Sequence, residues 1–171
     1  WCYNFSILGI FFKVFLLVSL VKKFREDRTD VSVSIVMPVY NEERYIEDSI
    51  ESILNQTFRD FEIVIIDDSS TDRTSEILKK YRSDDRVRTD FNERNRGWAG
   101  AVNRGIRISR GDYIALMDAA DISNSERLEK QIEFLKNNPK IAMVGSYHDW
   151  IDQEGRTLGK YKFPTDPKSI E

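Results

Sequence analysis

The sequence has 171 residues and contains only one cysteine and one histidine. The lone Cys2 excludes an internal disulfide bond and a cysteine-based zinc site. The lone His148 excludes metal sites built on a histidine pair and argues against a Ser-His-Asp hydrolase. Any metal ion bound here must therefore be held mainly by oxygen ligands, which suits Mg²⁺ or Mn²⁺.

A basic excess is also missing, since 26 Lys and Arg residues face 29 Asp and Glu residues. The net charge of -3 argues against nucleic acid as a partner. Two glycine-rich phosphate loops are absent as well, because no G-x-G-x-x-G follows a predicted strand and no P-loop pattern occurs. Rossmann dinucleotide binding and P-loop chemistry thus have little support. The length and a hydrophobic content of 40% suit one α/β domain.

The amino-terminal segment is unusually apolar, with thirteen Ile, Leu, Val and Phe residues between Phe5 and Val21. On membrane-insertion scales these residues contribute about −4 to −8 kcal/mol, and Lys13 costs about 3 kcal/mol. We therefore predict a membrane helix over residues 1–21 and a charged linker over residues 22–30. The basic residues after the helix would place the downstream domain in the cytoplasm. An amphipathic helix on the membrane surface or on the domain is the alternative.

From Val31 onward, short apolar runs alternate with segments whose apolar residues recur at helical spacing. This alternation predicts a mostly parallel sheet flanked by helices, in one α/β domain over residues 31–171. We expect Pro38 to end the first strand, Asn41 to cap the first helix, and Ser123 with Glu126 to form a capping box. The predicted strands are Val33–Met37, Phe61–Ile66, Val87–Thr89, Tyr113–Met117, Ile141–Gly145 and Thr157–Phe163, and one helix spans Gly97–Ile108.

Acidic residues follow two of these strands directly, with Asp67 and Asp68 after the second and Asp118 and Asp121 after the fourth. Parallel strands would gather these residues at one edge of the sheet, where ligands of open α/β sheets bind. Four carboxylates in one place repel one another unless a cation or hydrogen-bond donors offset them. A metal with a phosphate-bearing substrate would supply both. Taken singly, each aspartate has the alternative of capping a helix or a turn.

Three arginines surround Gly97 and are candidates to contact a diphosphate. They are Arg94, Arg96 and Arg104. The alternative is a solvated helix face.

Four stretches occur in a specific order: SIVMPVYNEERYIEDSIESILNQTFRDFEIVIIDDSSTDRTSEIL, NRGWAGAVNRGI, GDYIALMDAADIS and ERLEKQIEFL. Together they resemble the amino-terminal half of a family 2 glycosyltransferase with the Rossmann-like GT-A fold. The resemblance runs from Val33 to Phe163. It implies transfer of a sugar from a nucleoside-diphosphate sugar to an acceptor, with inversion at the sugar. It also implies a set of donor-binding residues, namely Pro38, Tyr40, Glu42, Asp67, Asp68, Arg96, Asn103 and Asp118.

The resemblance places residues 118–121 on the Asp-x-Asp motif of the family, whose common form is Asp-x-Asp-Asp and whose acidic residues bind ribose and a divalent metal. Asp118 and Asp121 occupy its first and fourth positions. The sequence departs from the common pattern at Ala120, where the family usually has the metal-ligand aspartate. The resemblance therefore implies a Mg²⁺ or Mn²⁺ site on Asp118 and Asp121. We expect the domain to be truncated at its carboxyl end, with the catalytic base and the acceptor site in the half that follows.

Three hypotheses remain open. The first is a metal-assisted, membrane-associated glycosyltransferase whose acceptor is a saccharide or a lipid-linked sugar, in the synthesis of a cell-surface polysaccharide or glycolipid. The second is a nucleotide-sugar-binding module without catalysis, because Ala120 replaces the usual metal-ligand aspartate and the acceptor half is missing. The third is a phosphorylation-dependent receiver domain, which is disfavoured because its acidic pair would follow the first strand rather than the second.

Overall fold

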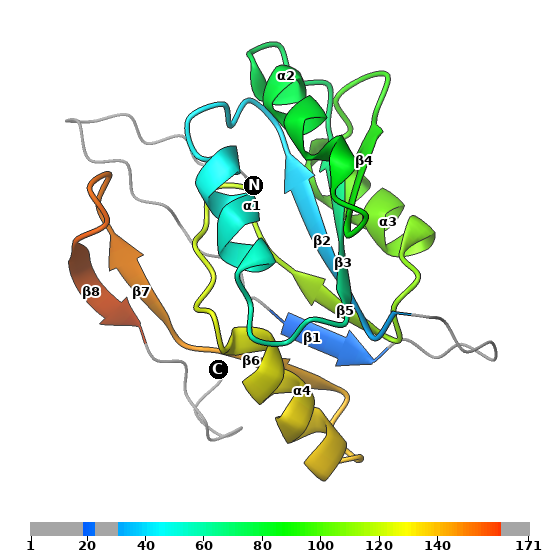
Figure 1. Cartoon of the computed structure of the whole chain (residues 1–171), viewed down its shortest axis with the longest axis vertical. Helices are drawn as coiled ribbons and strands as arrows, with labels where there is room; N and C mark the ends of the chain where they lie inside the picture. Colours follow the sequence, from blue (N-terminus) through cyan, green and yellow to red (C-terminus); the bar gives the residue numbers. More distant parts are fainter. Residues whose placement is uncertain (1–18, 23–30, 162–171) are drawn as a thin grey trace. The chain divides into compact units, whose positions relative to one another are not determined.

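The computed structural model describes residues 19–22 and 31–161 of the chain. These residues fall into two compact units, which are described separately: residues 19–22 with 31–146, and residues 147–161 (Figure 1). In chain order the elements are β1 (Ser19–Lys22), β2 (Val33–Val39), α1 (Ile46–Leu54), β3 (Phe61–Asp67), α2 (Thr74–Lys79), the 3₁₀ helix η1 (Lys80–Ser83), β4 (Val87–Phe91), α3 (Gly97–Ile108), β5 (Tyr113–Leu116), α4 (Arg127–Asn137), β6 (Met143–Gly145), β7 (His148–Ile151) and β8 (Thr157–Tyr161).

The larger unit is built on a six-stranded sheet with the order β4-β3-β2-β5-β1-β6. Strands β2, β3, β4 and β5 are parallel to one another, whereas β1 is antiparallel to both of its neighbours. The predicted mostly parallel sheet is therefore confirmed. Because β2 and β3 are central and buried along their whole length, they contain almost only apolar residues.

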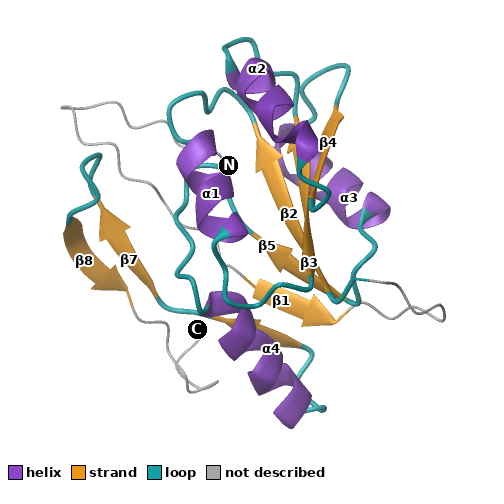
Figure 2. Cartoon of the chain, in the orientation of Figure 1, coloured by secondary structure: helices purple, strands orange, loops and turns teal. Residues whose placement is uncertain are grey.

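The two faces of this sheet pack against different helices (Figure 2). Alternate residues of β2, such as Ile35 and Met37, join the core formed with residues of α1, α2 and α4. Val64 and Ile66 of β3 point to the other face and pack against α3. Gly105 lies so close to Val36 that an added Cβ would overlap the valine side chain. A glycine in the middle of α3 thus lets the helix approach the sheet closely.

Strand β1 corrects the prediction of an apolar helix over residues 1–21. Ser19–Lys22 form a strand, in which Leu20 pairs with Ala115 of β5 and with Val144 of β6. A short apolar run fits a buried strand as well as a helix, so its pattern alone does not separate the two. Residues 1–18 and the linker residues 23–30 lie outside the described residues. Among the described residues, no helix has the length and apolar character needed to cross a bilayer.

Pro38 does not end β2, which continues to Val39. The backbone carbonyl of Val36 accepts a hydrogen bond from the N–H of Met117 at 3.1 Å, so the backbone groups of Val36 face the β5 side. Pro38 lies two residues further along and faces the same side. The pairing with β5 stops at Val36, and the ladder with β3 continues to Val39. Proline is tolerated here because no neighbouring strand needs the missing N–H.

Two predicted helix caps are also wrong. Helix α1 begins at Ile46, after Tyr45, and the side chain of Asn41 accepts hydrogen bonds from Thr71 instead. Helix α4 begins at Arg127 without a side-chain cap, and the Ser123 hydroxyl accepts a hydrogen bond from Gln56 instead. In both cases a contact with a distant segment replaces the local one that the sequence pattern favours.

The smaller unit is the antiparallel hairpin of β7 and β8, with an irregular register after Trp150. Asp152 begins the turn between the two strands, where its carboxylate accepts hydrogen bonds from the backbone N–H groups of Glu154 and Arg156. Tyr161 stacks on His148 and Trp150, with ring-centre distances of 5.3 and 6.4 Å. These rings line one face of the hairpin.

Candidate functional site

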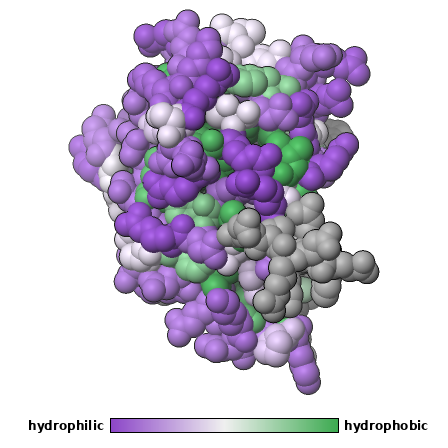
Figure 3. All heavy atoms as spheres, turned by 45° about the vertical axis from the view of Figure 1, so that its right-hand side comes forward, coloured by the Kyte–Doolittle hydropathy of each residue, from purple (hydrophilic) through white to green (hydrophobic). Residues whose placement is uncertain are grey.

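The polar residues just after β2 (Tyr40, Asn41 and Glu42), Asp67 and Asp68 at the end of β3, and Asp118 after β5 lie at one edge of the larger sheet, because these three strands run parallel. This is the edge that the sequence predicted for ligand binding. In Figure 1 the arrowheads of β2 and β4 mark its direction. On the face drawn in Figure 3, hydrophilic residues cover most of the described surface and hydrophobic ones show between them.

Asp68 is 3% exposed and lies immediately after β3. Its carboxylate accepts hydrogen bonds from Asn92 Nδ2 at 2.6 Å and from the backbone N–H of Arg96 at 2.9 and 3.0 Å. Its own N–H donates to Val39 at 2.8 Å, so it also joins β3 to β2. These donors are neutral groups, which fix the carboxylate without cancelling its charge.

Asp67 has a different role in the same turn. It is 1% exposed, and its carboxylate accepts hydrogen bonds from the backbone N–H of Ser70 at 2.9 Å and from the hydroxyl of Ser75. Ser70 precedes α2, and Ser75 lies in its first turn. Asp67 therefore shapes the turn that holds Asp68, and its part in donor binding stays a prediction.

The turns after β2 and β3 are bound to each other. Asn41 and Ser69 adopt φ values of 55° and 70°, in the left-handed region that few non-glycine residues occupy. Asn41 donates its N–H to Ser70 Oγ at 3.0 Å, and its side chain accepts the N–H of Thr71 at 2.7 Å. Glu42 N–H donates to Thr74 Oγ1 at 2.9 Å. The strained backbone at this edge is thus held by side chains of the facing turn.

Asp118 follows β5 and is bound by a residue that the sequence analysis did not single out. Trp98, in the first turn of α3, donates its indole N–H to Asp118 Oδ1 at 2.8 Å while its ring stays 42% exposed. Burial raises the pKa of the Asp118 carboxyl, and the hydrogen bond from Trp98 partly offsets that shift. The tryptophan connects α3 to the end of β5 and places an aromatic ring beside the carboxylate.

Asp121 is more deeply buried, at 5% exposure, and lies near the buried Arg127 of α4. Burial lowers the pKa of Arg127 to about 10, and the negative charge of Asp121 offsets part of that shift. Arg127 therefore remains a cation at neutral pH. Asp118 and Asp121 therefore have different neighbours. Trp98 donates a hydrogen bond to Asp118, whereas the positive charge of Arg127 lies near Asp121.

The other predicted donor-binding residues lie on the same elements. Pro38 is buried in β2, and Tyr40 is 46% exposed in the turn after it. Arg96 is exposed, and its Cβ lies against Gly100 of α3. Asn103 is exposed in the middle of α3, and no hydrogen bond in the described part of the chain joins it to the carboxylates. Their donor-binding roles stay predictions.

Few described side chains at this edge could serve as metal ligands. Among the described residues no three His, Cys, Asp or Glu side chains gather into a metal cage. A divalent ion that binds together with a diphosphate needs only one or two protein carboxylates. Asp118 meets that requirement, because the tryptophan uses only Oδ1. The residues present fit a metal shared with a phosphate-bearing ligand, rather than a metal centre made by protein alone.

Comparison with known proteins identifies the family. The model for glycosyl transferase family 2 matches residues 34–169. An uncharacterized glycosyltransferase of Methanocaldococcus jannaschii is 43% identical over 133 residues, which are 76% of this chain and 46% of that protein. TuaG of Bacillus subtilis, provisionally named a teichuronic acid biosynthesis glycosyltransferase, is 36% identical over 130 residues, 75% of this chain and 51% of that protein. This chain spans about half the length of these two relatives.

A solved structure shows the same fold. The crystal structure of S. aureus TarS 1-349 in complex with UDP-GlcNAc superimposes with a TM-score of 0.61 and 30% sequence identity, over 64% of this chain and 32% of that one. The mostly parallel sheet with helices on both faces is therefore GT-A-like. With a family model that covers residues 34–169, this chain belongs to glycosyltransferase family 2.

Proposed function

We propose that this chain forms the donor-binding part of a glycosyltransferase that moves a sugar from a nucleoside-diphosphate sugar to an acceptor hydroxyl. The observation that carries the proposal is the pair Asp67 and Asp68, buried at the ligand edge and bound only by neutral donors among the described residues. A carboxylate held in this way can accept hydrogen bonds from a base N–H or a ribose hydroxyl. The similarity to TarS, whose structure was determined with UDP-GlcNAc, supports the same ligand class here.

In this proposal the donor lies across the ends of β2, β3 and β5. Asp68, supported by Asp67, binds the nucleoside, with Pro38 and Tyr40 beside it. Glu42 lines the same part of the site, and its backbone N–H is fixed by a hydrogen bond to Thr74 Oγ1. The exposed Arg96 and Asn103 serve the diphosphate.

The reaction is metal-assisted in this proposal, with Asp118 as the direct ligand and Asp121 beside it. A bound Mg²⁺ or Mn²⁺ would offset the charge that develops on the departing nucleoside diphosphate. Arg127 places a positive charge close to Asp121, so Asp121 binds the metal less directly than Asp118 does. The exposed ring of Trp98 forms a wall next to this position.

The acceptor is proposed to be a saccharide or a lipid-linked sugar of a cell-surface polymer. The provisional name of TuaG, which refers to teichuronic acid biosynthesis, supports this class. The apolar residues 5–18 support a position at the membrane surface. We assign no catalytic base and propose inversion at the sugar only because the sequence resemblance implies it.

The experiment that tests the donor proposal is a calorimetric titration of the folded chain with UDP, GDP and their sugars, with and without Mn²⁺. Saturable binding of one nucleotide family, strengthened by Mn²⁺, is the expected result. A folded sample that binds none of these ligands contradicts the proposal.

A second candidate function is a nucleotide-sugar-binding module without catalysis, which Ala120 favours. Ala120 follows the buried Ala119 and offers no carboxylate where the family pattern usually has one. The two functions are separated by Ala120→Asp. If the missing ligand disables the site, the variant gains Mn²⁺-dependent affinity for the nucleotide. If wild type and variant bind Mn²⁺ equally well, the argument from the missing ligand fails.

A further inference from the structure

A chain of four polar side chains leads from β4 to the carboxylate of Asp68. Asn92 follows β4, is 4% exposed, and donates its Nδ2 hydrogen to Asp68 Oδ1 at 2.6 Å. The carbonyl oxygen of the same amide accepts a hydrogen bond from Arg104 Nη1 at 2.9 Å. The buried amide therefore lies between a cation and an anion.

Arg104 is fixed in turn by Asp90 of β4. Its Nε donates to Asp90 Oδ2 at 2.8 Å and its Nη2 to Asp90 Oδ1 at 2.9 Å, which is a bidentate pair. All three guanidinium nitrogens of Arg104 are thus engaged with Asp90 and Asn92. The arginine comes from α3, so the chain joins that helix to the ends of β4 and β3.

The charges at its two ends decide how the Asn92 amide is oriented. With its oxygen on the guanidinium of Arg104 and its nitrogen on the carboxylate of Asp68, both hydrogen bonds are charge-assisted. The opposite orientation would place the amide oxygen against the carboxylate and the NH₂ group against the guanidinium, and both contacts would be repulsive. Arg104 therefore determines which atom Asn92 presents to Asp68.

We propose that Asp90, Arg104 and Asn92 are positioning residues that hold the Asp68 carboxylate ready for the nucleoside of the donor. Arg104 acts through Asn92 and does not contact the phosphates, although its place near Gly97 in the sequence makes it a candidate for that contact. This inference rests on the proposed function, since it needs Asp68 to bind a nucleotide.

The two roles of Arg104 predict different results with ligands that differ only in their phosphates. The test measures dissociation constants of uridine, UMP and UDP, with guanosine, GMP and GDP in parallel, for wild type, Arg104→Met and Asp90→Asn. A positioning role weakens nucleoside, monophosphate and diphosphate by the same factor, about 10-fold, because the lost orientation affects the nucleoside end. A phosphate contact weakens the diphosphate most and leaves the nucleoside unchanged.

Asp90→Asn sharpens the test because it changes the local charge in the opposite direction from Arg104→Met. The positioning role predicts weaker binding for both variants. A phosphate contact predicts unchanged or tighter diphosphate binding in Asp90→Asn, since the arginine would lose its internal partner. Arg104→Lys keeps the charge and one donor, so it should recover part of the affinity that Arg104→Met loses.

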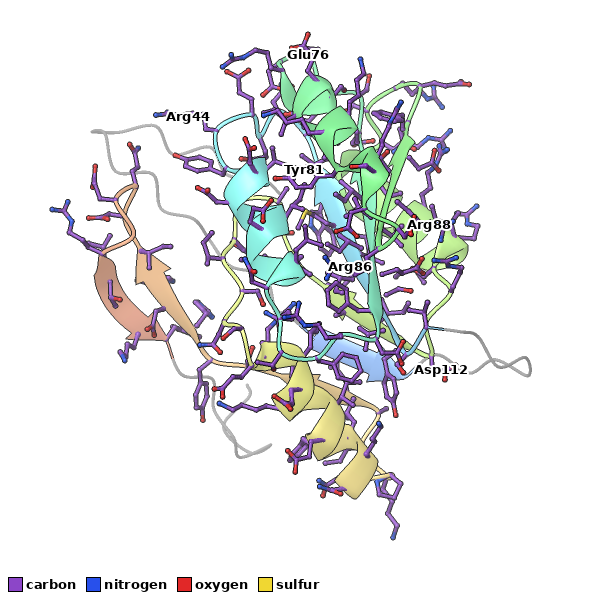
Figure 4. All side chains as sticks on the ribbon, viewed as in Figure 1. Arg44, Glu76, Tyr81, Arg86, Arg88 and Asp112 are labelled. Carbon is purple, nitrogen blue, oxygen red and sulfur yellow. The ribbon has the colours of Figure 1, made fainter. Side chains whose placement is uncertain are left out.

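Arg86→Met is the matched control for the loss of a bidentate ion pair. Arg86 binds Asp84 at 2.8 and 3.1 Å but also donates to Leu54 at the end of α1 and has no link to Asp68 (Figure 4). Its nucleotide affinity should equal that of wild type. Two results overturn this inference and leave the proposed function standing. One is a loss of affinity in Arg104→Met that grows with the number of phosphates, and the other is an unchanged affinity in that variant. A wild-type chain that binds no nucleoside or nucleotide overturns the proposed function, and this inference with it.

Discussion

The two ends of β3 each carry a buried carboxylate, but the two are balanced in different ways. Glu62, near the amino end, accepts hydrogen bonds from Arg88 Nη1 and Arg110 Nε, both at 2.9 Å. Asp68, just past the carboxyl end, is held by an amide and a backbone N–H. Figure 4 shows Arg88 near α3, where it also donates to the backbone carbonyl of Ile108 at 3.1 Å. Among the described residues, no Lys or Arg side chain pairs with Asp67, Asp68 or Asp118.

Within one sheet, this difference distinguishes a carboxylate that stabilises the fold from carboxylates that are suited to binding a ligand. At the amino edge the charge of Glu62 is neutralised inside the fold, and Ser34 and the backbone N–H of Arg110 complete its hydrogen bonds at 2.6 and 2.7 Å. At the carboxyl edge the negative charge is oriented but not neutralised. An edge of this kind is suited to a ligand that brings its own N–H and O–H donors or a metal ion.

The largest expected effect is on ligand binding, from Asp68→Asn. We expect nucleotide affinity to fall about 30-fold, because a charge-assisted hydrogen bond contributes about 2 kcal/mol. The variant keeps the shape of the side chain, so the chain should stay folded. Calorimetric titration with UDP measures the change, and circular dichroism checks the fold. An affinity equal to that of wild type would mean that the carboxyl edge does not bind the nucleoside.

Glu62→Ala should have the reverse profile. We expect the free energy of unfolding to fall by about 2 kcal/mol, which is less than for a fully buried pair because Arg88 and Arg110 remain partly exposed. Nucleotide affinity of the folded protein should not change. Urea denaturation and the same titration measure the two quantities. A stable variant with weakened nucleotide binding would break the comparison between the two edges.

A smaller effect is expected from acid. Burial alone would raise the pKa of Glu62, but hydrogen bonds from Ser34, Arg110 and Arg88 outweigh it and hold the pKa below its ordinary value of 4.5. A carboxyl whose pKa is lower in the folded state stabilises the fold above its unfolded pKa, and this contribution disappears as the pH falls through the folded pKa. Urea midpoints should therefore fall more steeply below about pH 4.5 in wild type than in Glu62→Gln. Parallel curves would show that Glu62 is not the group responsible.

The smallest expected effect comes from Trp98→Phe. The substitution keeps a smaller aromatic ring at the start of α3 and removes the indole N–H that binds Asp118 at 2.8 Å. We expect the Mn²⁺-dependent part of UDP affinity to fall about threefold, because Asp118 loses one orienting hydrogen bond. UDP affinity without Mn²⁺ should stay unchanged. A loss that is equal with and without Mn²⁺ would assign Trp98 to the nucleotide instead of to Asp118.

Much of the larger unit could be predicted from the sequence. Helix α3 matches its predicted bounds, and the apolar runs at Phe61 and Tyr113 are strands. Parallel strands then bring Asp68 and Asp118 to one edge. These features follow from local patterns, because a fully buried strand is continuously apolar and an amphipathic helix repeats every 3.6 residues.

The rest depends on contacts between distant segments, which no local pattern contains. Ser19–Lys22 form a strand because they pair with β5 on one side and with β6 on the other. The oxygen of Asn41 is used by Thr71, thirty residues away. Asn92 and Trp98 reach the carboxylates only after β4 and α3 have packed on the sheet. Nothing in their sequence context distinguishes them from ordinary loop and helix residues.

The most direct test of the central claim is to map UDP binding on the isotope-labelled chain by NMR. We predict saturable shifts of backbone amides at the carboxyl edge, at Asp68–Ser70 and Arg96–Trp98, with little change at Glu62 and Gly111 at the amino edge. Shifts centred on Glu62 and Gly111, or no saturable shifts at the carboxyl edge, would contradict the account.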